Sequence, residues 1–378
     1  MIKIDITMLA KFKVSNFKSF NEEVTFDLTD TNGYTFNKDS IKNGIVNSAL
    51  VYGHNGVGKS NLGLAIFDII EHLTDGKKND SGYEVYLNAY SKKKYAQFSY
   101  EFLIEGAKVE YSYRKLDYYT ILAESFSING KELARIDREK NNIAQFNFKG
   151  AETLKTEITN PGLSIIKYVK NNTELDKNEE NKVFMRFFSF IEGMLFFRSL
   201  PKNEYMGSTT ASPNIIDDII ERDNLVDFER FLNDAGIECK LKVIDEVDRK
   251  TIGFDFDGKE IPFTKIASQG TRSLMLFYYW FQRIKEQSIV SLVFIDEFDA
   301  FYHHDLSAII VRELKKTGVQ FILTKHNTSI ITNDLLRPDC YFLINKHSIR
   351  SLSKSTSKEL REAHNIEKMY KAGTFDGE

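Results

Sequence analysis

The sequence is poor in cysteine and proline, and it has no long apolar run. Only two cysteines, Cys239 and Cys340, occur in 378 residues, which excludes a disulfide framework and a cysteine zinc site and fits a reducing compartment. The five prolines, set against 30 phenylalanines and 18 tyrosines, argue against long disordered stretches. No segment is apolar over the length of a bilayer, and the first residues lack the apolar core of a signal peptide. We therefore expect a cytoplasmic protein that does not enter the membrane.

The charge balance, in contrast, excludes few classes of protein. The formal net charge is −3, with 28% charged and 42% hydrophobic residues, which is ordinary for a globular protein. Nothing in that total demands nucleic acid, although a local basic face that binds it remains possible. The length of 378 residues indicates two subdomains, or one domain with a large insertion.

A glycine-rich run carries the clearest motif. Gly53-x-x-x-x-Gly58-Lys59-Ser60 has the full P-loop spacing. The apolar run 48–52 before it predicts a buried strand, and residues 61–70 after it predict a helix despite Gly63. Strand, glycine loop and helix form the context in which backbone N–H groups and a helix N-terminus bind a polyphosphate. A chance glycine-rich turn is the less favoured reading of this run.

The motif assigns a role to each of its residues. Lys59 is expected to reach the β- and γ-phosphates of a bound nucleotide, and Ser60 to ligate Mg²⁺. The rest of the nucleotide cradle is expected from Gly53, Asn55, Gly56, Gly58 and Asn61.

A second apolar strand ends in two acidic residues. The run Leu292–Ile295 predicts a buried strand, and Asp296 and Glu297 follow at its carboxyl end. In an α/β sheet this end is where ligands bind, so Asp296 is a candidate Mg²⁺ ligand. Glu297 is placed to orient and polarise the attacking water.

Two further strand or helix ends carry polar residues. Ser268-Gln269-Gly270 precedes a strongly apolar helix, either as a second anion-binding helix N-terminus or as an ordinary serine N-cap. The strand predicted at 319–326 ends in His326, which either hydrogen-bonds a γ-phosphate or is structural.

The remaining pattern suggests three parts. Alternating residues predict strands within 9–28, 95–104, 108–114 and 119–136, so residues 1–145 are read as a β-rich lobe with the P-loop core. Residues 146–265 are read as an inserted helical or mixed lid, with helices at 183–198 and 214–235, a loop at 201–214 and strands within 237–263. Residues 266–378 complete the core, and from 268 helix and strand alternate three times.

Taken together, these residues resemble the heads of ABC-type ATPases of the AAA family. The order is P-loop, signature Ser268-Gln269-Gly270, Walker B Asp296-Glu297, a D-loop with Asp299, and switch histidine His326. Within that class the chain looks similar to the branch of RecF, SMC heads and OLD-type proteins, and residues 360–373 resemble the end of RloA-like bacterial anti-phage ATPases. Gln97 is the candidate Q-loop glutamine, but its strand pattern favours a structural role.

The resemblance implies an α/β P-loop fold of the ABC-head type and an ATP-hydrolysing switch. It implies catalytic roles for Glu297 and His326, and a homodimer or higher oligomer in which the signature acts on the partner's nucleotide. With no effector motif and no room for a Toprim nuclease, we expect a separately encoded effector, a nuclease or Toprim-like protein, in anti-phage defence.

Four alternatives stay open. A RecF-like DNA-repair ATPase and a non-hydrolysing nucleotide-dependent scaffold use the same motifs. A GTPase is suggested by Asp255-x-x-Gly258 and Asn345-Lys346, although Ser348 replaces the aspartate that reads guanine. A nuclease within the insertion would use Asp217, Asp218 and Glu221, but a charged helix face is usually solvated.

Overall fold

Two seven-stranded sheets organise the part of the chain that the computed structural model describes. This part comprises residues 7–75, 84–198, 204–207, 215–246, 249–285, 290–298, 304–326 and 328–375. One sheet is antiparallel and comes from the first 146 residues, and the other is mostly parallel and carries the P-loop strand. The α/β class predicted from the sequence, with a β-rich lobe beside a P-loop core, is confirmed.

The antiparallel sheet has the order β10-β9-β8-β7-β6-β1-β2. Its strands alternate buried and exposed residues, because one face is packed and the other faces solvent. The predicted N-terminal strands are confirmed, and their bounds are β1 Thr7–Ser15, β2 Val24–Asp27, β6 Ala96–Ile104, β7 Ala107–Lys115, β8 Ile121–Ile128, β9 Lys131–Asp137 and β10 Gln145–Phe146. A small two-stranded sheet follows β2, formed by β3 Ile41–Lys42 and β4 Ile45–Val46 after the 3-10 turn η1 Lys38–Ser40.

The second sheet has the order β12-β11-β16-β17-β5-β18-β19. The run from β11 to β18 is parallel, and β12 and β19 pair antiparallel at the two edges. The strands are β5 Ser48–Tyr52, β11 Met194–Arg198, β12 Glu204–Gly207, β16 Leu292–Asp296, β17 Gln320–Lys325, β18 Tyr341–Ile344 and β19 Ile349–Ser351. Strand β17 thus lies between the P-loop strand β5 and the acidic strand β16, which brings the carboxyl ends of all three together.

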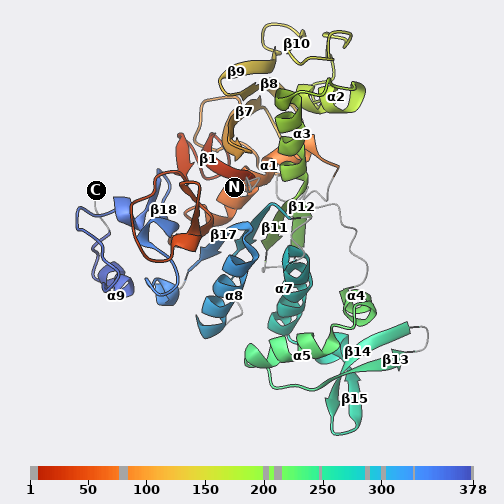
Figure 1. Cartoon of the computed structure of the whole chain (residues 1–378), viewed down its shortest axis with the longest axis vertical. Helices are drawn as coiled ribbons and strands as arrows, with labels where there is room; N and C mark the ends of the chain where they lie inside the picture. Colours follow the sequence, from red (N-terminus) through yellow and green to blue (C-terminus); the bar gives the residue numbers. More distant parts are fainter. Residues whose placement is uncertain are drawn as a thin grey trace.

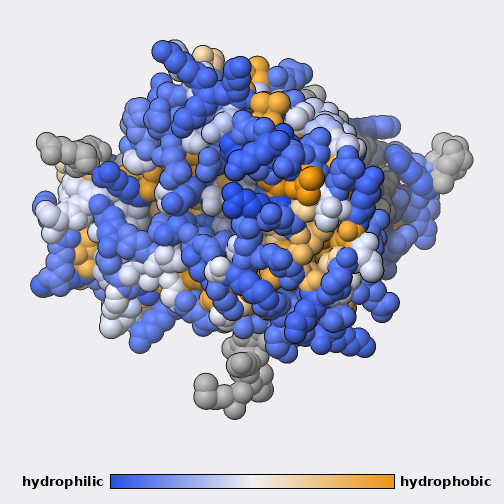
Figure 2. Space-filling view, turned by 90° about the horizontal axis from the view of Figure 1, so that it is seen from above, coloured by the Kyte–Doolittle hydropathy of each residue, from blue (hydrophilic) through white to orange (hydrophobic). Residues whose placement is uncertain are grey.

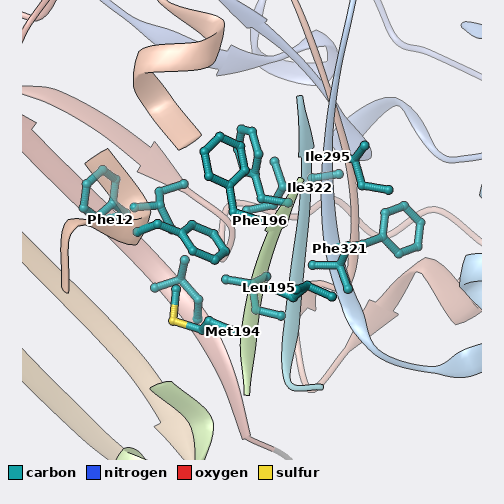
Figure 3. Close-up of a cluster of buried hydrophobic side chains, with 14 of the residues drawn as sticks. Phe12, Met194, Leu195, Phe196, Ile295, Phe321 and Ile322 are labelled. Carbon is teal, nitrogen blue, oxygen red and sulfur yellow. The ribbon is translucent and has the colours of Figure 1, made fainter. Parts of the chain in front are cut away.

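Helix α1, Lys59–Leu73, lies between the two sheets and is buried nearly all round. The sequence pattern predicts one apolar face, but the second sheet covers the other side as well. Gly63 is explained by this packing, since a β-carbon there would lie 2.6 Å from the ring of Phe294 on β16. The core next to α1 joins Phe12 of β1 to residues of β11, β16 and β17 (Figure 3).

The prediction of a helix over 183–198 is half wrong. Helix α3 spans Glu179–Glu192, and Gly193 ends it, because residues 194–198 continue as the buried strand β11. The run MLFFR is apolar enough for either element, and pairing with β16 decides it. The predicted loop at 201–214 likewise contains the edge strand β12. Helix α2, Ile165–Asn172, packs with α3 near the antiparallel sheet (Figure 1).

Residues 215–266 form a small unit at the opposite end of the long axis from β10 (Figure 1). The predicted helix over 214–235 is two helices, α4 Ile215–Glu221 and α5 Leu225–Asp234, broken where Asp223 has a positive φ of 54°. The predicted strands within 237–263 are confirmed as β13 Leu241–Glu246, β14 Arg249–Phe256 and β15 Lys259–Pro262. The short α6, Phe263–Ile266, leads into α7, Gln269–Lys285.

The C-terminal part departs once from the predicted alternation. Helix α8, His304–Thr317, precedes β17 as expected, but only the 3-10 turns η3 Thr328–Ile330 and η4 Pro338–Cys340 are described between β17 and β18. The turn η5, Leu352–Lys354, and helix α9, Ile366–Lys371, follow β19.

The predicted division at residues 145 and 265 stays a prediction, and the P-loop sheet takes strands from all three parts. None of the helices in the described ranges combines the length and apolar character needed to cross a membrane. The face seen from above the β9–β10 end is mostly hydrophilic, with small separate apolar areas (Figure 2).

Candidate active site

The loop between β5 and α1 has the backbone that the P-loop motif requires. Gly58 is the N-cap of α1 with φ 113°, and Gly56 has φ 77°, both in the region that favours glycine. A β-carbon on Gly53 would lie 2.6 Å from the carbonyl oxygen of Ile344 on the neighbouring β18. The loop is therefore held against the sheet, and its turn ends at the N-terminus of a 15-residue helix.

Two side chains of the motif are held by the loop and its neighbours. Lys59 is buried, and its Nζ donates to the carbonyl oxygens of Gly53 at 2.6 Å and His54 at 3.0 Å. The Nδ2 of Asn61 donates to the Oγ of Ser19 at 2.9 Å, in the turn between β1 and β2. The Lys59 side chain thus folds back onto the P-loop. Its ammonium group is expected to act on the bound phosphate together with the N–H groups of the loop.

Asp296 and Glu297 lie where predicted, at the carboxyl end of β16. Asp296 is 2% exposed, and its Oδ1 accepts from the hydroxyl of Thr324 on β17 at 2.7 Å. Glu297 follows with a positive φ of 52°, unusual for a residue with a side chain. Its Oε1 is 3.2 Å from the Nε2 of His326, so the predicted catalytic pair is brought together.

One pocket is lined by residues that follow the ends of the three strands β5, β16 and β17. It has a volume of about 220 Å³ and is lined by Asn55, Gly56, Gly58, Lys59, Ser60, Asn61, Glu297 and His326. Glycine backbone, the start of α1 and the Lys59 ammonium supply positive potential on one side. Glu297 lines the same pocket and supplies a carboxylate. This arrangement can hold an anion next to a group that accepts protons.

The residues predicted to hold a metal fit Mg²⁺ in their chemistry. Ser60 lines the pocket and offers a hydroxyl. Asp296 is not among the residues that line it, and offers a buried carboxylate one residue before Glu297. Across the described ranges, no three or more His, Cys, Asp or Glu side chains converge as a metal cage. Mg²⁺ commonly uses one or two protein oxygens together with phosphate oxygens, so a pair of ligands suffices.

The predicted signature residues lie elsewhere. Ser268 caps α7, accepting from the N–H of Thr271 at 3.1 Å and contacting its hydroxyl at 2.8 Å. Ser268 and Thr271 line a different pocket, with residues 237–240 and 254–257. Neither Gln269 nor Gly270 lines the P-loop pocket. Gln97 is exposed on β6 and lines a polar hollow on the antiparallel sheet, and Asp299 lies outside the described residues.

The competing motifs have structural explanations. Asp255 caps the turn between β14 and β15, where its Oδ1 accepts from the N–H of Gly258 at 2.8 Å. Asn345 does the same in the turn between β18 and β19, accepting from the N–H groups of His347 and Ser348. Asp218 is paired with Arg283 of α7 at 2.7 Å. These contacts explain the GTPase pattern as two turns, and Asp218 of the nuclease pattern as half of an ion pair.

Sequence reasoning missed two residues of the site. Ser19 packs on the P-loop from the β1–β2 turn, and Thr324 bonds the acidic residues from β17. Thr324 stands two positions before His326, near the end of an apolar strand. A polar residue at such a position is the sequence feature that could have indicated its role.

Comparison with known proteins assigns the family. No curated protein matches the chain. Among solved structures, the SMC head domain from Thermotoga maritima is similar at 15% identity and a TM-score of 0.42, covering 91% of this chain and 98% of that one. An SMC head bound to the C-terminal winged-helix domain of ScpA is similar at 17% identity and a TM-score of 0.46, covering 92% of this chain and 98% of that one. RecF with ATP is similar at 14% identity and a TM-score of 0.40, covering 92% of this chain and 99% of that one. The family model described as "AAA domain, putative AbiEii toxin, Type IV TA system" matches residues 48–332, most of the chain, and the chain belongs to this family of AAA domains.

Proposed function

We propose that this chain binds ATP with Mg²⁺ and hydrolyses it. The observation that carries the proposal is the position of Glu297, which lines the same pocket as Lys59 and Ser60 although it is more than 200 residues away in sequence. A pocket built only to hold a phosphate gains nothing from a carboxylate, because like charges repel. A carboxylate at that place is suited to take a proton from water.

The P-loop supplies the binding part of this reaction. The backbone N–H groups of the loop and of the first turn of α1 bind the phosphate oxygens, and Lys59 offsets their charge. Ser60 and Asp296 would hold Mg²⁺, which neutralises charge on the transferred phosphoryl group when it is bound. Gly56 and Gly58 keep this wall free of side chains, so the anion approaches the backbone directly.

Glu297 and His326 supply the hydrolytic part. Glu297 orients the attacking water and accepts its proton, and His326 orients the Glu297 carboxylate through the 3.2 Å contact. The histidine follows β17, the strand between the P-loop strand and the acidic strand. It is therefore placed to respond to whatever occupies the pocket between them.

The proposal extends to a head-to-head dimer of the ABC type. Ser268, at the start of α7, lines a separate pocket from the P-loop of its own chain. A second copy would bring that helix N-terminus to the γ-phosphate, and a two-fold arrangement then encloses two nucleotides. Asp299 is proposed to line the same junction.

The work done by this switch is proposed to be control of a separate effector, a nuclease or Toprim-like protein, in bacterial anti-phage defence. The support is the family description, which names a putative toxin of a toxin–antitoxin system, and the resemblance of residues 360–373 to RloA-like ATPases.

The experiment that tests hydrolysis is Glu297→Gln. Glutamine keeps the size and polarity of the side chain but cannot accept a proton as a base, so turnover should fall about 100-fold or more. Binding should survive, because Lys59, Ser60 and Asp296 remain. Phosphate release measures turnover, and the rise in melting temperature with Mg–ATP measures binding.

The control is Glu22→Gln, the same change at an exposed glutamate. It should leave both turnover and protection unchanged. Wild-type turnover in Glu297→Gln would place water activation elsewhere and favour the non-hydrolysing scaffold. Protection by GTP as strong as by ATP would contradict the assignment of ATP.

A further inference from the structure

Thr324 connects the two acidic residues to the neighbouring strand. It is fully buried on β17, beside β16, and regular pairing between these strands ends one residue earlier at Ile295↔Leu323. Beyond that pair, Thr324 joins β17 to residues 296–298, which follow the end of the pairing on β16. Its hydroxyl donates to Oδ1 of Asp296 at 2.7 Å and accepts from the N–H of Glu297 at 2.8 Å, and its carbonyl accepts from the N–H of Phe298 at 3.3 Å.

A hydroxyl is the group that can make both side-chain contacts at once. It has one proton and two lone pairs, so it donates to the carboxylate while it accepts from the amide. Each bond fixes the direction of the other, and the β-branched side chain is already restricted about its first torsion. A valine has the same shape but neither bond, and it would leave the buried Asp296 oxygen and the Glu297 amide without this partner.

The backbone of Glu297 gives the contact its significance. Glu297 has φ 52°, a conformation that side-chain-bearing residues rarely adopt. Such conformations persist only where surrounding contacts impose them, and they concentrate at functional sites. The left-handed turn takes Glu297 out of the strand direction, and its carboxylate then meets His326 at the P-loop pocket.

We propose that Thr324 is a positioning residue for ATP hydrolysis, which holds Asp296 and the left-handed backbone of Glu297 in place so that the Glu297 carboxylate faces the phosphate pocket. The proposal rests on the proposed function, since it concerns the orientation of the residue assigned to water activation. Thr324 itself does not line the pocket.

The test compares Thr324→Val with Thr324→Ser. Valine keeps the shape and removes the hydroxyl, so kcat should fall between about 10- and 100-fold, the range for a misplaced catalytic group. KM for ATP and the dissociation constant for Mg–ATP should change less than kcat, because Lys59, Ser60 and the P-loop backbone are untouched and Asp296 loses a single hydrogen bond. Serine keeps the hydroxyl and should restore kcat to within about threefold of wild type. Thr251→Val, at a buried threonine of β14, is the matched control and should not change kcat.

A second measurement does not depend on turnover. Hydrogen exchange of the peptide containing Glu297 should be faster in Thr324→Val than in wild type, and unchanged in Thr324→Ser. Should the valine variant fail to fold, Thr324→Cys replaces it, because a thiol is only a weak donor.

The outcomes separate the two proposals. A wild-type protein without hydrolysis contradicts the proposed function, and the exchange measurement still decides whether Thr324 holds Glu297. If wild type hydrolyses ATP and Thr324→Val has the same kcat and the same exchange, the positioning role is refuted. If Thr324→Val lowers kcat and the thermal protection by ATP equally, Thr324 has a merely structural role and the positioning role is refuted. The same holds if Thr324→Ser does not restore kcat.

Discussion

Ser19 lies against the α-carbon of Gly58, so closely that a β-carbon on Gly58 would be 2.4 Å from its Oγ. The two residues are far apart in sequence, and the β1–β2 turn brings Ser19 onto the P-loop. Asn61 binds the same oxygen from the first turn of α1. The N-terminal lobe therefore braces the nucleotide loop directly, which makes Gly58 a glycine for two independent reasons, its positive φ and this contact.

We predict that Gly58→Ala weakens ATP binding by at least about tenfold. The new β-carbon must displace Ser19 or the loop, and displacement moves the N–H groups at the start of α1 that bind phosphate. The dissociation constant for Mg–ATP, measured by titration, tests this.

The control for Gly58→Ala is Gly106→Ala. Gly106 also has a positive φ, 87°, but a β-carbon there would meet no atom within 4 Å. The change should cost about 1 kcal/mol of stability from the left-handed backbone and leave ATP affinity unchanged. If adding Ser19→Gly to Gly58→Ala restores no affinity, the clash with Ser19 is not the cause.

We predict that Lys59→Ala abolishes ATP binding at concentrations that saturate wild type. Lys59 is the one lysine or arginine among the P-loop residues 53–61, so its loss leaves the phosphate charge without a lysine partner. Thermal protection by Mg–ATP should disappear. Lys92→Ala, at an exposed lysine, should keep full protection. Persistent turnover in purified Lys59→Ala would exclude this pocket as the ATPase site.

We predict that mixing Lys59→Ala with Ser268→Arg restores part of the ATPase activity that each variant lacks. If the signature helix of one copy completes the pocket of another, a mixed dimer has one site with both defects and one with neither. Turnover as a function of mixing ratio measures the recovery. A strictly monomeric Glu297→Gln protein at saturating Mg–ATP would rule out shared sites.

We predict that Asp218→Asn destabilises the protein by about 3 kcal/mol at neutral pH, because it leaves Arg283 buried without its partner. Asp218 and Arg283 are 11% and 5% exposed. Burial acts to raise the pKa of Asp218, but hydrogen bonds and charge from Arg283 and Arg222 outweigh it, so the pKa lies below its usual value.

The sign of the pH dependence follows from that lowered pKa. The ion pair contributes fully above the unfolded pKa, and its contribution is lost as the pH falls through the folded pKa. The stability difference between wild type and Asp218→Asn should therefore shrink below about pH 4. Glu221→Gln, an exposed change on the same helix, should shift stability by less than about 0.5 kcal/mol. Denaturant unfolding at neutral pH and at about pH 3 checks both, and equal differences at the two pH values would contradict the assignment.

Sequence patterns predicted the elements that alternate or that stand beside a motif. The strands of the N-terminal lobe, the P-loop with its flanking strand and helix, and the acidic end of β16 were all legible from local periodicity and spacing. The segment 183–198 was not, because an apolar run such as MLFFR is compatible with a helix or a buried strand, and only pairing with β16 selects the strand.

The sequence by itself determined which chemistry is available: glycines and a lysine for a phosphate, and a carboxylate and a histidine at strand ends. These chemical groups depend on residue type and on short spacing, both of which can be read from the sequence. Only the tertiary structure decided that Glu297 and His326 meet beside Lys59, that Ser19 braces Gly58, and that Thr324 holds the acidic pair. Those relations join residues tens to hundreds of positions apart, and they depend on β17 lying between β5 and β16, an order of strands that no local pattern encodes.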